Sequence, residues 1–468
     1  MPAEREPGFR SLRKERQCVD LPVEGSIPAW LGGSLIRNGP AEFEPADQPV
    51  DHWFDGLAML HRFAIDDGRV RYTNRFLRSD AYERAMQGGG VSGFATGSAG
   101  LLGRVKAFLL EETYDNANVI AERIGDQYLA LTETPRPVVF DPEMLETRGH
   151  APYDGPAPSG HLACAHVQHD PWTGGVVTFE TEFGRTSTYH VYETDDPATR
   201  EPIASIAVDE PAYMHSFALT RHYVVLTEFP YVVNPLDFLT GGSGSFIEAF
   251  RWEPERGTRF VVIDRASGTV VAEPRTEAFF GFHHVNAYEH EDEVVLDLET
   301  VPAAPESIGA LYLDDLRENQ LDVPAGTLER FRVHPEEATV DRTEYYAGGT
   351  ALPRVSPAVR CRKHRYVYAQ SVKQPATSWP RAIVKVDVGS GATQEFDGDG
   401  TYLSEPVFVP QPDGDTEDDG VVLAVGLDPE SGHSWLLVLD GETLTERARA
   451  AVPHAIPFDF HGRYFQNL

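Results

Sequence analysis

Residues 260–273 read FVVIDRASGTVVAE: a run of β-branched and aromatic residues, the turn Asp264–Gly268 of the form Asp-x-x-x-Gly, and a second run of the same kind. Such residues on both sides of a short turn with glycine are typical of a β-hairpin. The same turn spacing recurs at Asp170–Gly174, Asp387–Gly391 and Asp428–Gly432, mostly with a strand-like run on each side. Spaced hairpins without long helices between them predict an all-β fold.

The length of 468 residues decides among the all-β architectures. Spaced hairpins fit a sandwich, a barrel or a propeller, but one sandwich is too small for this chain. About seven propeller blades of roughly 40–45 residues would use about 300 residues and leave the rest for loops and short helices on one face. We therefore predict a single domain over residues 1–468, an all-β propeller of about seven blades with a cap.

The charge and the hydropathy pattern restrict the partners and the compartment. Asp and Glu number 73 and Lys and Arg 40, so the formal net charge is −33. A surface this acidic repels phosphate backbones, which argues against nucleic acid as a partner. The few basic residues are nearly all Arg, a composition typical of the cytosol of a salt-loving, haloarchaeal organism, with an acidic mesophilic protein as the alternative. Since no apolar stretch reaches about 18 residues and the N-terminus has no apolar core, we expect a cytoplasmic chain without a membrane-spanning helix.

Histidines stand at four places in apolar, strand-like surroundings. These are His166 in LACAHVQHD, His215 in AYMHSFALT, the pair His283–His284 in FFGFHHVNAYE, and His461 in IPFDFHGRYF. The separations of 49, 68 and 178 residues correspond to about one, one to two, and three to four blades. Because the inner strand of each blade faces the propeller axis, histidines at one depth would converge there. Four imidazoles suit a borderline divalent metal such as Fe(II) better than calcium or magnesium.

Strand geometry leaves some choices open among these histidines. Successive side chains of a strand face opposite ways, so His283 and His284 cannot both face the axis, and the period alone does not say which one does. His169 raises the same question beside His166. For any one position taken alone, a histidine that simply completes the core is the ordinary alternative.

The chain resembles a known family along nearly its whole length. The motifs that carry the similarity include GSLIRNGP at 33–40, HWFDGLAMLHRF at 52–63, EDDGVV at 417–422 and FDFHGRY at 458–464. They are similar to those of the carotenoid cleavage oxygenases, a family that includes β-carotene oxygenases, epoxycarotenoid and stilbene-cleaving dioxygenases and the retinoid isomerohydrolase. Several look closest to the animal-type branch. The resemblance implies a seven-bladed propeller in which four histidines hold Fe(II) on the axis.

The resemblance also implies roles for single residues. The implied metal ligands are His166, His215, His283 and His461, with His283 chosen over His284. The histidines expected to be structural are His52, His61, His169 and His284. The positions implied to line the substrate cavity are Phe54 and Thr132.

Carboxylates beside the ligands form a further implied set. A carboxylate that accepts the far N–H of a ligand imidazole fixes its tautomer and raises its basicity. The family uses three glutamates for this, and Glu133 and Glu405 match two of them, whereas the third position holds Ala351. We expect His283 to lack its usual partner unless water, a backbone carbonyl or another acid such as Glu344 substitutes. The expected consequence is weaker iron retention or altered reactivity.

Segment 85–112 is a candidate for contact with a membrane. Its Gly-rich run Gly88–Gly103 and the helix-like residues that follow lie where the family has a membrane-facing apolar patch. A helix over 98–112 would gather Leu and Val side chains on one face, which suits peripheral contact with a lipid surface. The alternative is a helix that packs on the top of the propeller.

The resemblance implies a non-haem Fe(II) dioxygenase that uses O2 to cleave a conjugated C=C bond of a carotenoid or apocarotenoid into two carbonyl products. Two alternatives use the same scaffold: cleavage of stilbenes, and retinoid isomerohydrolysis without O2. A third is a propeller that binds carotenoid without catalysis, which the alanine at position 351 motivates. The sequence leaves the natural substrate, the cleaved bond and the oligomeric state open.

Overall fold

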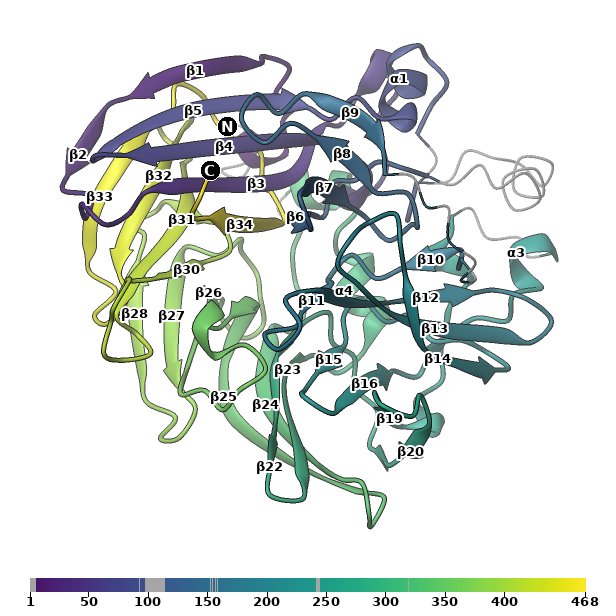
Figure 1. The fold of residues 1–468 in the computed structure, drawn as a ribbon. Helices are drawn as coiled ribbons and strands as arrows, with labels where there is room; N and C mark the ends of the chain where they lie inside the picture. Colours follow the sequence, from purple (N-terminus) through teal and green to yellow (C-terminus); the bar gives the residue numbers. More distant parts are fainter. Residues whose placement is uncertain are drawn as a thin grey trace.

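The fold comes from a computed structural model that describes residues 6–91, 93–96, 114–151, 153, 155, 157, 159–240, 245–318 and 320–468. Its large antiparallel sheets stand around a common centre (Figure 1). This arrangement is a β-propeller, as the spaced hairpins predicted.

The first three sheets of the ring come mainly from the first half of the chain. One contains β1 (Arg16–Leu21), β3 (Gly33–Glu42), β4 (Leu57–Asp66), β5 (Arg69–Phe76) and β34 (His461–Phe465). The next contains β6 (Ile120–Ile124), β7 (Gln127–Leu131), β8 (Val138–Phe140) and β9 (Thr147–His150). The third contains β10 (Leu162–Ala163), β11 (Gln168–His169), β12 (Val176–Glu182), β13 (Ser187–Thr194) and β14 (Glu201–Val208).

The remaining sheets complete the ring. One contains β15 (Ala218–Leu219), β16 (Tyr223–Glu228), β19 (Thr258–Asp264), β20 (Val270–Ala272) and β21 (Arg275–Thr276). A seven-stranded sheet contains β22 (His284–His290), β23 (Glu293–Thr300), β24 (Gly326–His334), β25 (Thr339–Arg354), β26 (Tyr366–Ser371), β27 (Ala382–Asp387) and β28 (Thr393–Asp397). The last contains β2 (Val23–Gly25), β29 (Tyr402–Leu403), β30 (Val407–Pro410), β31 (Gly420–Asp428), β32 (His433–Asp440) and β33 (Glu446–Ala451).

The seven-stranded sheet supplies two blades. Residues of β25 from Thr339 to Thr350 pair with β24, and Thr350, Ala351 and Arg354 near its end pair with β26. One 16-residue strand therefore belongs to two neighbouring blades. With the five other large sheets this gives the seven blades of the predicted propeller.

The ring closes through both ends of the chain. The C-terminal strand β34 pairs with β3, and the N-terminal strand β2 pairs with β33. Strands distant in sequence thus share a sheet, which fixes His461 beside β3 near the centre. Short helices and a two-stranded ribbon, all outside the blades, are α1 (Asp80–Met86), α3 (Asp237–Thr240), α4 (Ala304–Gly309), α5 (Leu313–Arg317), β17 (Tyr231–Val232) and β18 (Arg251–Trp252).

Each Asp-x-x-x-Gly turn joins two paired strands, as predicted. Their glycines Gly174, Gly268, Gly391 and Gly432 all have φ between 67° and 82°. In every copy the glycine N–H donates to the carbonyl of the aspartate four residues earlier, at 2.8 or 2.9 Å. The left-handed conformation explains the glycine, because it is strained for residues with a Cβ.

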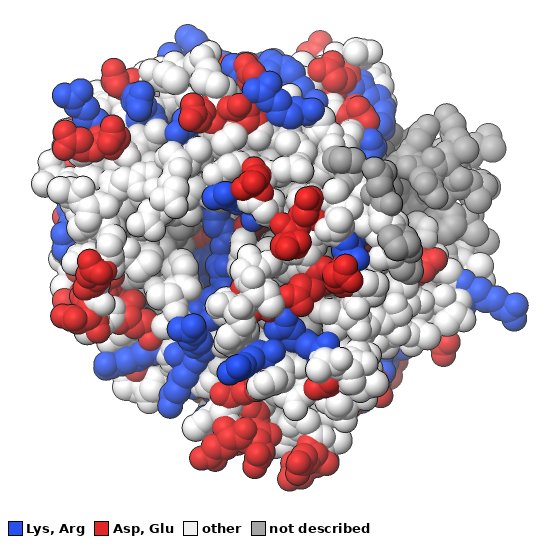
Figure 2. Space-filling model, viewed as in Figure 1, with Lys and Arg blue, Asp and Glu red and all other residues white. Residues whose placement is uncertain are grey.

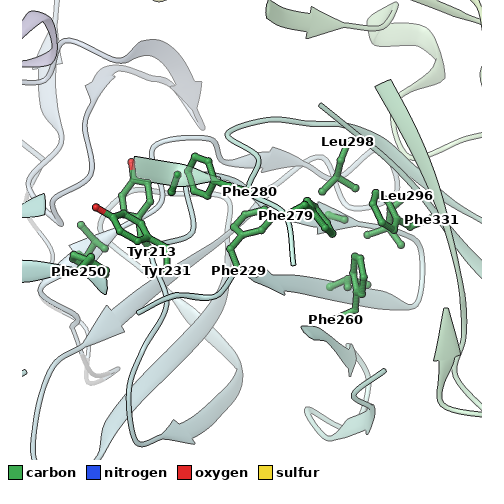
Figure 3. Close-up of a cluster of buried hydrophobic side chains, with 14 of the residues drawn as sticks. Tyr213, Phe229, Tyr231, Phe250, Phe260, Phe279, Phe280, Leu296, Leu298 and Phe331 are labelled. Carbon is green, nitrogen blue, oxygen red and sulfur yellow. The ribbon is translucent and has the colours of Figure 1, made fainter. Parts of the chain in front are cut away.

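Aromatic side chains take part in the apolar core between neighbouring blades. Phe260 of β19, Leu296 and Leu298 of β23 and Phe331 of β24 lie in one buried cluster (Figure 3). Phe279 stacks on Phe331 with ring centroids 4.9 Å apart. This cluster fixes the blades on both sides of residues 279–284, and so the position of His283.

Two expectations concern membranes. Within the described ranges, every helix is too short or too polar to cross a bilayer. Of the candidate contact segment 85–112, the structure describes only 85–91 and 93–96, so the helix predicted over 98–112 lies outside the described residues.

Candidate metal centre

Four histidines from four places in the chain meet at the centre of the ring. His166 lies just before β11, His215 just before β15, His283 just before β22, and His461 begins β34. Each offers one ring nitrogen, and these atoms all lie within 4.8 Å of one another. The Nε2 atoms of His166 and His215 are 3.0 Å apart. The structure thus brings together all four histidines that the sequence singled out.

Burial favours the neutral form of three of these four imidazoles. The pKa values of His166 and His283 lie well below the ordinary value, because both rings are buried and face other imidazoles. Burial also lowers the pKa of His461. The Nε2 atom of His283 is buried and has no hydrogen-bond partner. A neutral imidazole with an unpartnered ring nitrogen is a good ligand for a borderline divalent metal, so the four-histidine donor set fits such an ion.

Two predicted glutamates contact the Nδ1 atoms of two of the rings. Glu133 Oε1 lies 2.6 Å from Nδ1 of His215, and Glu405 Oε1 lies 2.7 Å from Nδ1 of His461. Burial alone would raise the pKa of Glu405, but Arg354, His461 and Arg37 together hold it below its ordinary value. An ionised carboxylate at Nδ1 makes that nitrogen a donor and directs Nε2 toward the centre.

His283 has a different carboxylate neighbour from the one considered in the sequence. Nδ1 of His283 lies 3.4 Å from Oε2 of Glu299 on β23. Glu344 is exposed on β25, where it pairs with Glu329, so this suggested substitute was wrong. Burial raises the pKa of Glu299 to about 8 against smaller opposing effects of Thr350 and Leu352. The sequence signal that could have identified Glu299 is its place in the apolar run EVVLDLET, because a buried carboxylate needs a partner.

The other histidines near the motifs have hydrogen-bond partners away from the cluster. His284 lies between the hydroxyls of Ser216 and Thr227, each at 2.8 Å. The remaining pairs are His169 with Glu122 at 2.8 Å, His61 with Tyr72 at 2.7 Å, and His52 with the carbonyl of Ile308 at 3.1 Å.

An apolar cavity of about 470 Å³ opens on the histidine cluster. Phe54 and Thr132 are in its lining, and so are His215, His283 and His461. Further aromatic residues of the wall are Trp53, Phe94, Phe282, Trp379, Phe458 and Phe460. Such a wall suits an apolar molecule, and three of the four histidines are part of it.

A smaller polar cavity of about 140 Å³ meets the cluster as well. Its wall contains His166, Arg354, Arg360 and Arg463. Figure 2 shows a hollow near the middle of one face in which Lys and Arg side chains gather, while Asp and Glu side chains lie mostly around it. On this face the acidic side chains therefore lie mostly around the basic hollow.

Comparisons with known proteins show what the chain is similar to. A family model described as RPE65, retinal pigment epithelial membrane protein, matches residues 9–466. The chain is 32% identical to the apocarotenoid-15,15'-oxygenase of Synechocystis sp., over 98% of this chain and 95% of the relative. It is also 32% identical to the carotenoid isomerooxygenase of Galleria mellonella, over 96% and 95%. A solved structure of cobalt-substituted Synechocystis ACO superposes with a TM-score of 0.88 at 29% identity, covering 100% of this chain and 99% of that one.

Proposed function

The chain belongs to the carotenoid cleavage oxygenase family, and on this premise we propose that it is a non-haem Fe(II) dioxygenase for a carotenoid or apocarotenoid. The reaction would cleave one conjugated C=C bond with O2 and give two carbonyl products. The observation that carries the proposal is the convergence of four histidine nitrogens at the wall of an apolar cavity.

The histidines would hold the metal, and the glutamates would orient them. The proposed ligand atoms are the inward nitrogens of His166, His215, His283 and His461. Bound iron would supply the activation of O2, which the side chains of the cavity cannot provide. Glu133 and Glu405 keep the Nδ1 protons of His215 and His461 in place, so that their Nε2 lone pairs face the centre.

The cavity would choose which double bond reacts. A polyene has no polar group along its length, so its position depends on the shape of the wall. The Phe54 ring lies 5.4 Å from the rings of both Phe94 and Phe460, which makes a continuous aromatic surface next to the histidines. This surface orients the chain of double bonds and keeps water out of the centre. Thr132 contributes a hydroxyl to the otherwise mostly apolar wall.

The experiment is a turnover in 18O2 with the anaerobically purified, iron-loaded protein. A panel of carotenoids, apocarotenals and stilbenes is tested, and the products are reduced with borohydride at once because carbonyl oxygens exchange with water. We expect labelled oxygen in both products of one polyene. Unlabelled, isomerised products would instead support isomerohydrolysis, and iron-loaded protein without turnover on any substrate would support the non-catalytic binder.

We also propose that segment 85–112 contacts a lipid surface from which the substrate enters. The support is the apolar residues of the sequence and the apolar lining of the cavity. Deletion of residues 97–111 should reduce co-sedimentation with phosphatidylcholine vesicles in molar salt, with turnover of a detergent-solubilised substrate as the control for folding. Unchanged sedimentation would contradict this contact.

A further inference from the structure

We propose that Glu299 is the positioning residue of His283, reaching it from β23 beside Ala351. This inference rests on the proposed function only in taking His283 as a metal ligand. Glu133 and Glu405 serve His215 and His461, and Glu299 gives a third ring a carboxylate at Nδ1.

The backbone ties the two residues together before their side chains meet. The N–H of Glu299 donates to the carbonyl of His283 at 3.1 Å, just beyond the pairing of His284 with Leu298. Their side chains are 9% and 13% exposed, and 3.4 Å separate Oε2 from Nδ1. The pair is therefore fixed at the end of the β22–β23 ladder, at the wall of the apolar cavity.

Space for the Glu299 carboxylate comes from two small residues. A Cβ at Gly326 of β24 would lie 2.4 Å from Oε1 and 2.5 Å from Cγ of Glu299, so any larger residue there would displace the side chain. Gly326 pairs with Thr350 on β25, and the next residue is Ala351, which lines the same cavity as Glu299. The carboxylate thus approaches β25 across a glycine, beside a residue too small to reach His283 itself.

The surroundings leave Glu299 no other charged partner. Oε1 of Glu299 is buried without a hydrogen-bond partner, and among the described residues His283 is the basic group within ion-pair distance. The nearby acid Asp297 is instead held by Arg330 through two contacts of 2.7 Å. A buried acid side chain without a cation depends on the polar groups that it faces. For Glu299 these are the Thr350 hydroxyl, the Leu352 N–H and the Nδ1 atom of His283.

The distance predicts how firmly each ring is held. At 3.4 Å the contact from Glu299 to His283 is longer than the 2.6 and 2.7 Å contacts of the other two pairs and longer than an ordinary N–H···O bond. His283 is therefore the least constrained of the three carboxylate-paired rings, and it gains most from a closer carboxylate.

The test measures the affinity of the metal-free protein for Co(II), by competition with a chromophoric chelator. We expect Glu299→Gln and Glu299→Ala to weaken binding by about 10–100-fold, the usual effect of losing such a partner. The double variant Glu299→Ala/Ala351→Glu, which moves the carboxylate to the adjacent strand, should recover at least half of the loss on a logarithmic scale. Glu344→Gln, an exposed acid of β25, is the matched control and should bind like the wild type.

The outcomes separate this inference from the proposed function. If the wild type binds one Co(II) per chain and both Glu299 variants bind within twofold of it, the inference is wrong and the proposed function stands. If the wild type binds no Co(II), both fail. Thermal melting of the metal-free variants checks folding, and the Co(II) ligand-field bands of the Gln variant give a readout of ligand geometry that a merely structural role would not move.

Discussion

Nδ1 of His461 lies 2.7 Å from Oε1 of Glu405, and both side chains are buried. The same carboxylate accepts a hydrogen bond from Arg354 Nε at 2.6 Å and one from the backbone N–H of Gly462 at 2.8 Å. One carboxylate thus contacts a proposed ligand, an arginine of the polar cavity and the backbone at the start of the closing strand β34. Glu405 therefore links the proposed metal centre to the strand that closes the ring.

Substitution of Glu405 tests this coupling. Glu405→Gln should lower Co(II) affinity by about 10–100-fold, because the amide no longer fixes the His461 tautomer by charge. It should also lower the unfolding midpoint of the metal-free protein, because Arg354 and Arg37 lose a buried counter-charge. Glu430→Gln, exposed in the turn between β31 and β32, is the control. Unchanged affinity in Glu405→Gln would contradict the orienting role.

The second prediction concerns the ion pair that ties β3 to the segment before β34. Arg37 and Asp459 are 0% and 3% exposed, with Nε 2.8 Å from Oδ2. Asp459→Ala should cost about 3–5 kcal/mol in urea denaturation, because it leaves a buried guanidinium with one counter-charge fewer. Asp126→Ala removes the partner of Arg123 at an exposed site and should leave the unfolding midpoint unchanged. Equal effects of the two variants would refute the argument.

Acid stability should depend on Glu122, the buried partner of Arg463. Burial alone would raise the pKa of Glu122, but the charge of Arg463, helped by His169, lowers it from 4.5 to about 2. Burial lowers the pKa of His169, so Arg463 is the partner that remains charged. A carboxylate with a depressed pKa stabilises the fold above its unfolded pKa and loses this contribution as the pH falls.

The window for this effect runs from about pH 4.5 down to about pH 2. In Glu122→Gln the free energy of unfolding should fall less steeply with decreasing pH across that window than in the wild type, whatever the absolute stability. Urea denaturation at closely spaced pH values measures the slope. Parallel profiles of wild type and variant would contradict the assignment.

Phe54 tests the aromatic wall separately from the metal. Phe54→Ala opens the wall beside His52, Phe94 and Phe460. We expect KM to rise and the ratio of cleavage products to change, with Co(II) affinity unaltered, because no proposed ligand loses a contact. Trp172→Ala removes an aromatic side chain that is 38% exposed and should change neither quantity. If Phe54→Ala gave the same ratio of cleavage products as the wild type, Phe54 would not position the substrate.

The sequence predicted much of this architecture, because hairpin turns and strand-like runs can be recognised from a few neighbouring residues. The Asp-x-x-x-Gly turns mark hairpins since glycine alone takes the left-handed position easily, and the histidine spacings match the blades. The shared strand β25 is different: its 16 residues join two blades, so no blade-length repeat marks that boundary. The choice between His283 and His284 depends on the hydroxyls of Ser216, just before β15, and Thr227 on β16.

The role of Glu299 shows most clearly what a single sequence omits. Its approach to His283 depends on the pairing of β23 with β24 and on the absence of a Cβ at Gly326. Neither condition is visible from the residues next to Ala351, so the nearest acid along β25, Glu344, looked like a substitute. That strand carries Glu344 to the surface.

The most direct test of the central claim is an anomalous-scattering measurement at the iron edge on crystals of the anaerobically purified protein. The account predicts one iron peak among the inward nitrogens of His166, His215, His283 and His461. The same crystals hold an internal comparison, because Asp80, Asp115 and His150 form another group whose possible ligand atoms lie within 4.8 Å of one another, and Arg136 pairs with Asp80 there. Absence of a peak at the four histidines, or a peak at that other group alone, would contradict the account.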